Sequence, residues 1–177
     1  DGKGAHAPNV MMEDKCSCPN NCGLCTNHLS HSGLANIIVT NRCDLTCWYC
    51  FFYVKKGLEG AYMYEPTQDQ VRAMMKTLRA ERPIPGNSMQ ITGGEPMLRE
   101  DITDLIKIMK EEHVDHIQMN TNGIRHALDP EAGRDVRMAG CNNLYLSFDG
   151  VTARTNPKNH WEIPYALDTC RKTGTTV

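Results

Sequence analysis

The sequence predicts an α/β fold with a parallel sheet, preceded by a short cysteine-rich segment. From Leu34 onward, short β-branched runs alternate with longer amphipathic stretches of helical period. Four such β-then-α units follow one another, and this order implies parallel strands joined by right-handed crossovers. Residues 1–33 are instead rich in Gly, Pro, Asn, Cys and His, with almost no apolar periodicity. We therefore expect a small N-terminal segment over 1–33 and an α/β core over 34–177.

Strands and helices are placed by the period of their apolar residues. Strands are expected over residues 34–40, 88–92, 116–120 and 143–148, with a fifth beginning as the chain stops. Helices are expected over residues 66–81, 101–112, 130–139 and 161–172. Thr67 and Gln70 have the spacing of a capping box at the start of the first helix, and Pro83 and Pro85 end it.

The pleat of these strands predicts one apolar and one polar face. The apolar face would carry Ile37, Val39, Met89, Ile91, Ile117, Met119, Leu144, Leu146 and Phe148 and would pack on the helices. The other face would present Asn36, Thr40, Gln90, Thr92, Gln118, Asn120, Asn122, Tyr145, Ser147 and Asp149. A sealed eight-stranded barrel is filled with apolar side chains, so this wetter face should house a ligand, unless its polar residues merely flank a buried sheet.

The loops that follow the strands should form one site. Cys43, Gly93, Thr121 and Asp149 each come just after the C-terminal end of an expected strand. Folds with parallel sheets place their binding sites at that edge. We therefore expect the four loops to meet at one rim.

Composition excludes several classes of protein. The 177 residues include 19 basic and 21 acidic side chains without a block of like charge, so neither a nucleic-acid tract nor a polybasic membrane patch is expected. The sequence has no apolar run of the ~18 residues that a membrane-spanning helix needs, so neither such a helix nor a signal peptide is expected. Seven of the nine cysteines lie at spacings of two to four residues, which favours metal binding in a reducing, cytoplasmic compartment. The first residue is Asp, so we expect a fragment or a trimmed chain.

Three cysteines after the first strand form a metal-binding pattern. Cys43, Cys47 and Cys50 stand at C-x3-C-x2-C spacing. A [4Fe–4S] cluster normally takes four cysteines, so three leave one iron open for a substrate or cofactor. A zinc knuckle, or a ferredoxin-type cluster with a distant fourth cysteine, is the alternative.

A second group of cysteines lies in the N-terminal segment. Cys18, Cys22 and Cys25 repeat the same spacing, and Cys16 adds a fourth thiolate. A site with four cysteines is closed, so we expect a structural or electron-relay metal: mononuclear iron, zinc or an auxiliary cluster. His28 and His31 are interpreted as ordinary polar loop residues. Cys141 and Cys170 match no ligand spacing and are expected to be buried as small hydrophobes.

The Cys43 triplet, with the later T-G-G-E-P at residues 92–96, resembles the radical SAM superfamily. The resemblance covers roughly residues 34–177. It implies a partial (βα)6 TIM-like barrel of which about four βα units are present, incomplete at the C-terminus. It also implies an enzyme in which S-adenosylmethionine chelates the open iron. One electron then cleaves the sulfonium and releases a 5′-deoxyadenosyl radical that abstracts hydrogen from an unactivated C–H bond.

The resemblance also implies roles for individual residues. Cys43, Cys47 and Cys50 would be the catalytic cluster ligands, Tyr49 would touch the adenine ring, and Glu95 would meet the ammonium group of the cofactor. The other cofactor-binding positions implied are Thr92, Gly93, Gly94, Asn120, Asn122, Ser147 and Asp149. An external electron donor of the ferredoxin or flavodoxin type is implied as a partner, with a small-molecule or lipid substrate.

Within the superfamily, the upstream phrase C-P-N-N-C-G-L-C-T-N-H resembles the archaeal tetraether-lipid synthase group. That resemblance implies C–C bond formation between archaeal lipid tails by an enzyme in the cytoplasm or at the membrane surface. Homologues that methylate a hydroxymethylpterin in methanopterin biosynthesis provide the alternative. A non-catalytic iron–sulfur electron-transfer protein and a zinc-stapled binding module remain as interpretations from other classes.

Overall fold

The computed structural model describes residues 32–50, 64–81, 85–148, 150, 152 and 161–177. The four N-terminal cysteines, Cys16, Cys18, Cys22 and Cys25, lie outside these residues, and so do Asp149 and Pro83. The predictions made for those residues therefore stay predictions.

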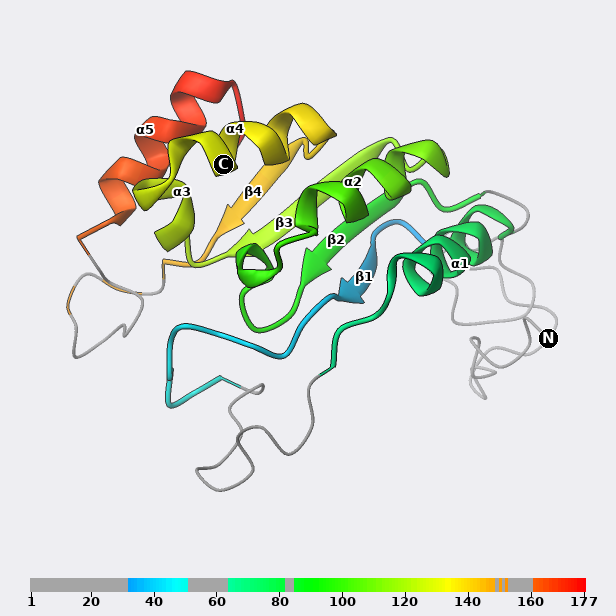
Figure 1. The fold of residues 1–177 in the computed structure, drawn as a ribbon, viewed down its shortest axis with the longest axis horizontal. Helices are drawn as coiled ribbons and strands as arrows, with labels where there is room; N and C mark the ends of the chain where they lie inside the picture. Colours follow the sequence, from blue (N-terminus) through cyan, green and yellow to red (C-terminus); the bar gives the residue numbers. More distant parts are fainter. Residues whose placement is uncertain (1–31, 51–63, 82–84, 149, 151, 153–160) are drawn as a thin grey trace, which may run out of the picture.

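A parallel sheet forms the centre of the described chain. Its strands are β1 (Ala35–Ile38), β2 (Ser88–Thr92), β3 (His116–Thr121) and β4 (Asn143–Leu146), hydrogen-bonded in that order. The predicted parallel α/β fold is thus confirmed, and Figure 1 shows the four strands side by side. An isolated parallel bridge joins Asn143 to Thr176, where a fifth strand is expected.

The helices follow the sequence prediction closely. They are α1 (Gln68–Arg79), α2 (Ile102–Glu111), α3 (Ile124–Leu128), α4 (Pro130–Ala139) and α5 (Ile163–Thr173), with a short 3-10 helix, η1, at Pro96–Leu98. The predicted capping box is present, because Gln70 N donates to Thr67 Oγ1 while Thr67 N donates to Gln70 Oε1. The sequence analysis missed α3 and η1, which are too short to show a helical period.

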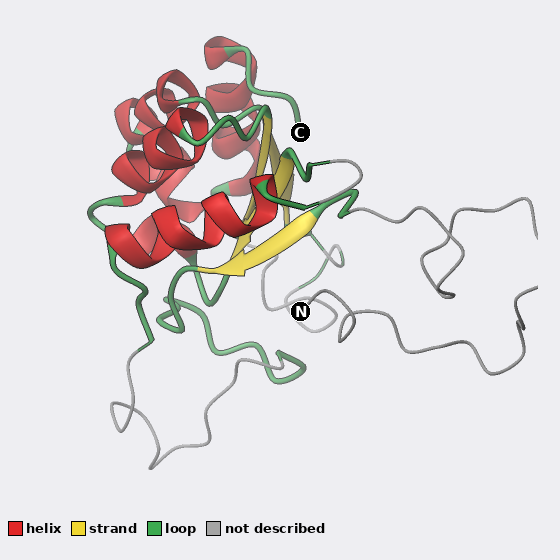
Figure 2. Cartoon of the chain, turned by 90° about the vertical axis from the view of Figure 1, so that its right-hand side faces the viewer, coloured by secondary structure: helices red, strands yellow, loops and turns green. Residues whose placement is uncertain are grey.

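All helices of the described residues lie on one face of the sheet, as Figure 2 shows. The hydrophobic core lies between that face and the helices and contains Ile37, Met89, Ile91, Ile117, Met119 and Leu144. Cys141 and Cys170 are also buried there, as predicted. The prediction was wrong for Phe148, which is 48% exposed. Because β4 ends at Leu146, the pleat that would turn Phe148 inward does not continue to it.

One buried arginine joins the elements around the site. The Arg99 guanidinium is 5% exposed and donates from Nη1 to the carbonyl oxygens of Val39 and Pro66, at 2.9 Å each. Its other nitrogens, Nε and Nη2, donate to the Asp101 carboxylate at 2.8 Å. Arg99 thereby ties the end of β1 to the entry of α1 and the start of α2, a role that the sequence analysis did not find.

Candidate active site

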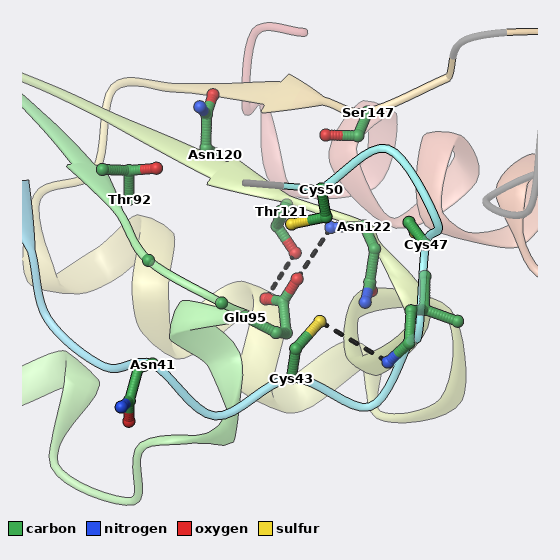
Figure 3. Close-up of a pocket in the computed structure, with 13 residues that line it drawn as sticks. Asn41, Cys43, Cys47, Cys50, Thr92, Glu95, Asn120, Thr121, Asn122 and Ser147 are labelled. Atoms are coloured by element: carbon green, nitrogen blue, oxygen red, sulfur yellow. Dashed lines mark hydrogen bonds between the residues drawn. The ribbon is translucent and has the colours of Figure 1, made fainter. Parts of the chain in front are cut away.

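A cleft of about 180 Å³ lies at the carboxyl ends of the strands. Its lining comes from all four strand-end loops: Asn41, Cys43, Leu45, Cys47, Cys50, Thr92, Gly93, Gly94, Glu95, Asn120, Thr121, Asn122 and Ser147. Figure 3 shows these side chains around the cavity. The structure therefore brings ten of the predicted site residues together. Tyr49 is not in the lining; it is 39% exposed and packs edge-on against Trp48.

The cysteine loop, residues 41–50, runs along one side of the cleft. Cys47 is buried, Cys50 is half-buried and Cys43 is exposed. The turn within the loop is closed by Cys50 N, which donates to Cys47 O at 3.0 Å. Leu45 N donates to Cys43 Sγ at 3.5 Å. All three thiols thus share one cavity, with a backbone amide already directed at one of the sulfurs.

The three thiols fit an iron–sulfur cluster by the chemistry of their donor atoms. Thiolates are soft ligands that select such clusters. Among the described residues, no three Cys, His, Asp or Glu side chains are gathered closely enough to hold a single metal ion. Although Cys43 is exposed as a residue, partial desolvation of its thiol raises the pKa to about 11, and the charges of Asp44 and Glu95 add to the rise. A bound metal would have to supply the positive charge that keeps this sulfur deprotonated.

Glu95 is the buried acid of the cleft. Its carboxylate is 2% exposed and accepts three hydrogen bonds: Met97 N and Thr121 Oγ1 at Oε1, and Asn122 N at Oε2. Burial raises its pKa to about 7, while these hydrogen bonds act in the opposite direction. Both carboxylate oxygens therefore accept hydrogen bonds from the protein itself, and the predicted contact with a cofactor ammonium group stays a prediction.

Gly93 and Gly94 allow two loops to approach closely. Gly94 N donates to Thr40 O at 2.8 Å, and Glu95 N donates to Arg42 O at 2.7 Å. A Cβ atom on Gly93 would collide with the carbonyl oxygen of Thr40, and one on Gly94 with that of Arg42. The close approach seen in the structure is thus between two backbones, whereas the resemblance implied that both glycines bind the cofactor.

Asn122 connects the end of β3 to the cysteine loop. Its side-chain Nδ2 donates to Asp44 Oδ1 at 2.6 Å, and its Oδ1 accepts from Ile124 N at 2.9 Å. Asn122 and Asp44 are 78 positions apart in the sequence. Asp44 was not among the predicted site residues, because no local pattern marks such a contact.

The face of the sheet that helices leave uncovered is largely polar, as predicted, although Ile38 and Tyr145 are also exposed on it. Gln90 Nε2 donates to Asn120 Oδ1 at 3.0 Å, and Asn143 Nδ2 donates to Gln118 Oε1 at 3.1 Å. These amide pairs cross between neighbouring strands and lead toward the cleft, which Asn120 itself lines. Thr40 departs from the expected pattern, because it is fully buried and its hydroxyl donates to Glu65 at 2.9 Å.

The fold and the cleft define an α/β protein of the barrel class, with a cysteine-lined site at the carboxyl ends of its strands. The family model described as "Radical SAM superfamily" matches residues 37–177, and the chain belongs to that superfamily. This confirms the resemblance stated from the cysteine triplet and the T-G-G-E-P turn.

The relatives found are enzymes by name. The chain is 38% identical over 165 residues to the 7,8-dihydro-6-hydroxymethylpterin dimethyltransferase of Methanocaldococcus jannaschii, an alignment that covers 90% of this chain and 32% of the relative. It is 32% identical over 142 residues to the GTP 3',8-cyclase of Clostridium acetobutylicum, covering 77% of this chain and 42% of the relative. The chain thus spans less than half the length of these relatives. Within the part of the chain that is described, no helix is long and apolar enough to span a bilayer.

Proposed function

We propose that the protein holds a [4Fe–4S] cluster on Cys43, Cys47 and Cys50 and cleaves S-adenosylmethionine there by reduction. The observation that carries this proposal is the convergence of three thiols and the polar strand ends in one cleft of a superfamily member. When bound, the cluster would pass one electron from a ferredoxin- or flavodoxin-like donor to the sulfonium, splitting it into methionine and a 5′-deoxyadenosyl radical that takes hydrogen from an unactivated C–H bond.

The protein's part is to leave one coordination position open and to order the cleft. The two other cysteines that the structure describes, Cys141 and Cys170, belong to the hydrophobic core and do not line the cleft. No further described cysteine is therefore placed to cap the cluster. The half-buried Thr92, Asn120 and Ser147 offer hydroxyl and amide groups on the far side of the cleft, where a polar cofactor needs partners.

For the substrate, methylation of a hydroxymethylpterin-like heterocycle is the better-supported candidate. The dimethyltransferase relative carries such a pterin in its name and aligns with most of the chain. The uncovered face of the sheet, with its Gln90–Asn120 and Gln118–Asn143 pairs, suits a polar ring with several hydrogen-bonding groups. In this interpretation a separate methyl donor supplies the new carbon.

Coupling of archaeal lipid tails, the first expectation from the sequence, stays a prediction. Its support is the N-terminal phrase, which does not separate lipid from pterin chemistry. The names of the relatives reported above refer to a pterin and to GTP. A lipid tail needs an apolar tunnel, and the described part of the uncovered face is largely polar. For a lipid substrate, the protein would work at the surface of a membrane; for a pterin, in the cytoplasm.

We further propose that Cys16, Cys18, Cys22 and Cys25 hold a second metal, iron or zinc. Their repeated spacing supports this. Metal analysis of a protein in which the Cys43 triplet is replaced by alanine tests it. About one zinc, or residual iron, per chain is the expected content, and a metal-free protein would contradict the proposal.

Anaerobic reconstitution with iron and sulfide tests the cleavage. After reduction, the protein should show the EPR signal of a [4Fe–4S] cluster, and this signal should change when S-adenosylmethionine is added. Methionine and 5′-deoxyadenosine should appear together by chromatography. Replacing Cys170, a buried cysteine outside the cleft, by alanine is the matched control and should leave both results intact. An EPR signal that does not change when S-adenosylmethionine is added would support the electron-transfer interpretation instead.

The substrate is tested by comparing two compounds, a hydroxymethyl-dihydropterin and an archaeal diether lipid, each deuterated at its reacting carbon. The true substrate should transfer deuterium to 5′-deoxyadenosine and should stimulate its formation. Transfer from the lipid alone would reverse the preference for the pterin.

A further inference from the structure

We propose that Asp44 and Asn122 are positioning residues that fix the cysteine loop against the end of β3. The proposal deepens the proposed function and rests on it, because it takes Cys43, Cys47 and Cys50 as cluster ligands. It differs from the prediction that Asn122 binds the cofactor, since here Asn122 acts through another residue.

Both polar atoms of the Asn122 side chain have hydrogen-bond partners within the protein. Its Nδ2 donates to Asp44 Oδ1 at 2.6 Å and its Oδ1 accepts from Ile124 N at 2.9 Å. A flipped amide would place oxygen against oxygen at Asp44 and nitrogen against N–H at Ile124, so the neighbours fix one orientation. Asn122 is 5% exposed, and the short distance to Asp44 is typical of a hydrogen bond to a charged acceptor.

Buried hydrogen bonds also fix the backbone at Asn122. Asn122 N donates to Glu95 Oε2 at 2.8 Å, and Thr121 Oγ1 donates to the other oxygen of the same carboxylate. Glu95 also caps η1 through Met97 N. Asn122 is therefore anchored in a buried network, while Asp44 lies on the exposed loop that it holds.

The hydrogen bond from Asn122 to Asp44 affects Cys43, one of the proposed cluster ligands. Asp44 stands between Cys43 and Leu45, and Leu45 N donates to Cys43 Sγ at 3.5 Å. Amide hydrogen bonds to a ligating sulfur tune the potential and stability of a cluster. By fixing Asp44, Asn122 keeps the Leu45 amide directed at this sulfur.

The side chains of Asp44 and Asn122 can be exchanged with each other, and this exchange tests the proposal. Asn122→Asp would set two carboxylates against each other, whereas Asp44→Asn keeps an acceptor for Asn122 Nδ2. The double variant Asp44→Asn with Asn122→Asp restores a hydrogen bond of opposite polarity and keeps the net charge. In that variant the carboxylate introduced by Asn122→Asp would still accept from Ile124 N.

The experiment measures iron loss to a chelator after anaerobic reconstitution of the whole protein, without S-adenosylmethionine. Asn122→Asp and Asp44→Ala should each lose iron about tenfold faster than the wild type, as expected for a lost hydrogen bond to a charged group. Asp44→Asn and the double variant should stay within about threefold. The double variant should also recover the wild-type EPR line shape and midpoint potential. Asp104→Asn, which removes an exposed carboxylate on α2, is the matched control.

Two results would overturn the proposal. Asp44 is exposed, so Asp44→Ala should fold, and wild-type iron retention in that variant would mean that the loop does not need the pair. A double variant as impaired as Asn122→Asp alone would mean that Asn122 acts on its own, as a cofactor contact would. Because iron is followed without the cofactor, the expected pattern supports the proposal even in a protein that fails to cleave S-adenosylmethionine, and only the proposed function would then fall.

Discussion

The helix-covered side of the sheet and the rim at the strand ends have different roles. On the helix-covered side of the sheet, apolar side chains are buried and form one core cluster. At the strand-end rim, thiols, amides and hydroxyls surround a cavity, and the cysteine loop is largely exposed. Glu95 lies where the two meet, buried like a core residue but lining the cleft. We therefore expect changes at the rim to remove chemistry, changes under the helices to remove stability, and changes at Glu95 to remove both.

The largest effect should come from the rim. Replacing Cys43, Cys47 or Cys50 singly by alanine should abolish cleavage of S-adenosylmethionine, because two thiolates cannot hold the cluster with its open iron. The Cys43→Ala and Cys50→Ala apo-proteins should unfold at nearly the same denaturant concentration as the wild type, since these two cysteines do not belong to the hydrophobic core. Product analysis and denaturation of the apo-protein measure both. Cleavage that survives in any of the three variants would show that the wrong triplet was assigned.

Glu95→Ala should affect both sides. It leaves Met97 N, Thr121 Oγ1 and Asn122 N without their acceptor in a buried place. A buried donor left without its acceptor typically costs about 1–3 kcal/mol of unfolding free energy. Cofactor binding should weaken while the reconstituted protein still takes up iron, because the thiolates are untouched; iron loss to a chelator should become faster, because Asn122 N loses its acceptor.

Urea denaturation of the apo-protein and iron analysis test the Glu95 prediction. Glu100→Ala, an exposed neighbour, is the matched control and should change neither. An unchanged unfolding free energy would mean that Glu95 faces the ligand and not the protein. A protein that takes up no iron on reconstitution would mean that Glu95 supports the cluster directly.

The elements of the helix-covered side could be predicted from the sequence, because they follow from the local spacing of apolar residues. The contacts that depend on tertiary placement could not be predicted. Alternating strands and helices, the Thr67–Gln70 cap and the buried Cys141 and Cys170 all follow from local pattern, and all are present. The helix α3 was missed because five residues show less than two turns.

At the rim, the sequence predicted which loops meet but not the hydrogen bonds between them. The convergence of the cysteine loop with the G-G-E-P turn follows from parallel strands, whose ends share one edge. The Asp44–Asn122 pair, the three donors on Glu95 and the Arg99 bridge each join residues from different loops or elements. Asp, Asn and Glu are ordinary loop residues, so no spacing along the chain identifies such partners.

His126 should make the helix-covered side sensitive to acid. It is 2% exposed, its Nδ1 has no hydrogen-bond partner among the described residues, and burial lowers its pKa to about 4. Between that value and the unfolded pKa of about 6.5, the unfolded chain binds the extra proton, so stability falls as pH drops through this window. Between pH 7 and pH 5 the wild type should lose about 2 kcal/mol through this residue.

His126→Leu should remove that loss, seen as the difference between urea titrations of the two proteins at pH 7 and pH 5. The contribution of Glu95, whose raised pKa acts with the opposite sign, is common to both proteins and cancels in the difference. His116→Leu, on an exposed position of β3, is the control. Equal pH dependence in the wild type and His126→Leu would contradict the prediction, and cleavage activity per cluster should be the same in both.

The smallest effect should come from the start of α1, because Thr67 does not line the cleft. Thr67→Ala removes the side-chain acceptor for Gln70 N and should cost about 1 kcal/mol of unfolding free energy. Thr77→Ala on the same helix is the matched control, because the Thr77 hydroxyl only donates back to Ala73 O within the helix, and its removal should be near neutral. Iron retention and the EPR response should not change in either variant. A change in the cluster signal on loss of this cap would mean that α1 transmits its position to the cysteine loop, and the division between a stabilising side and a chemical side would fail.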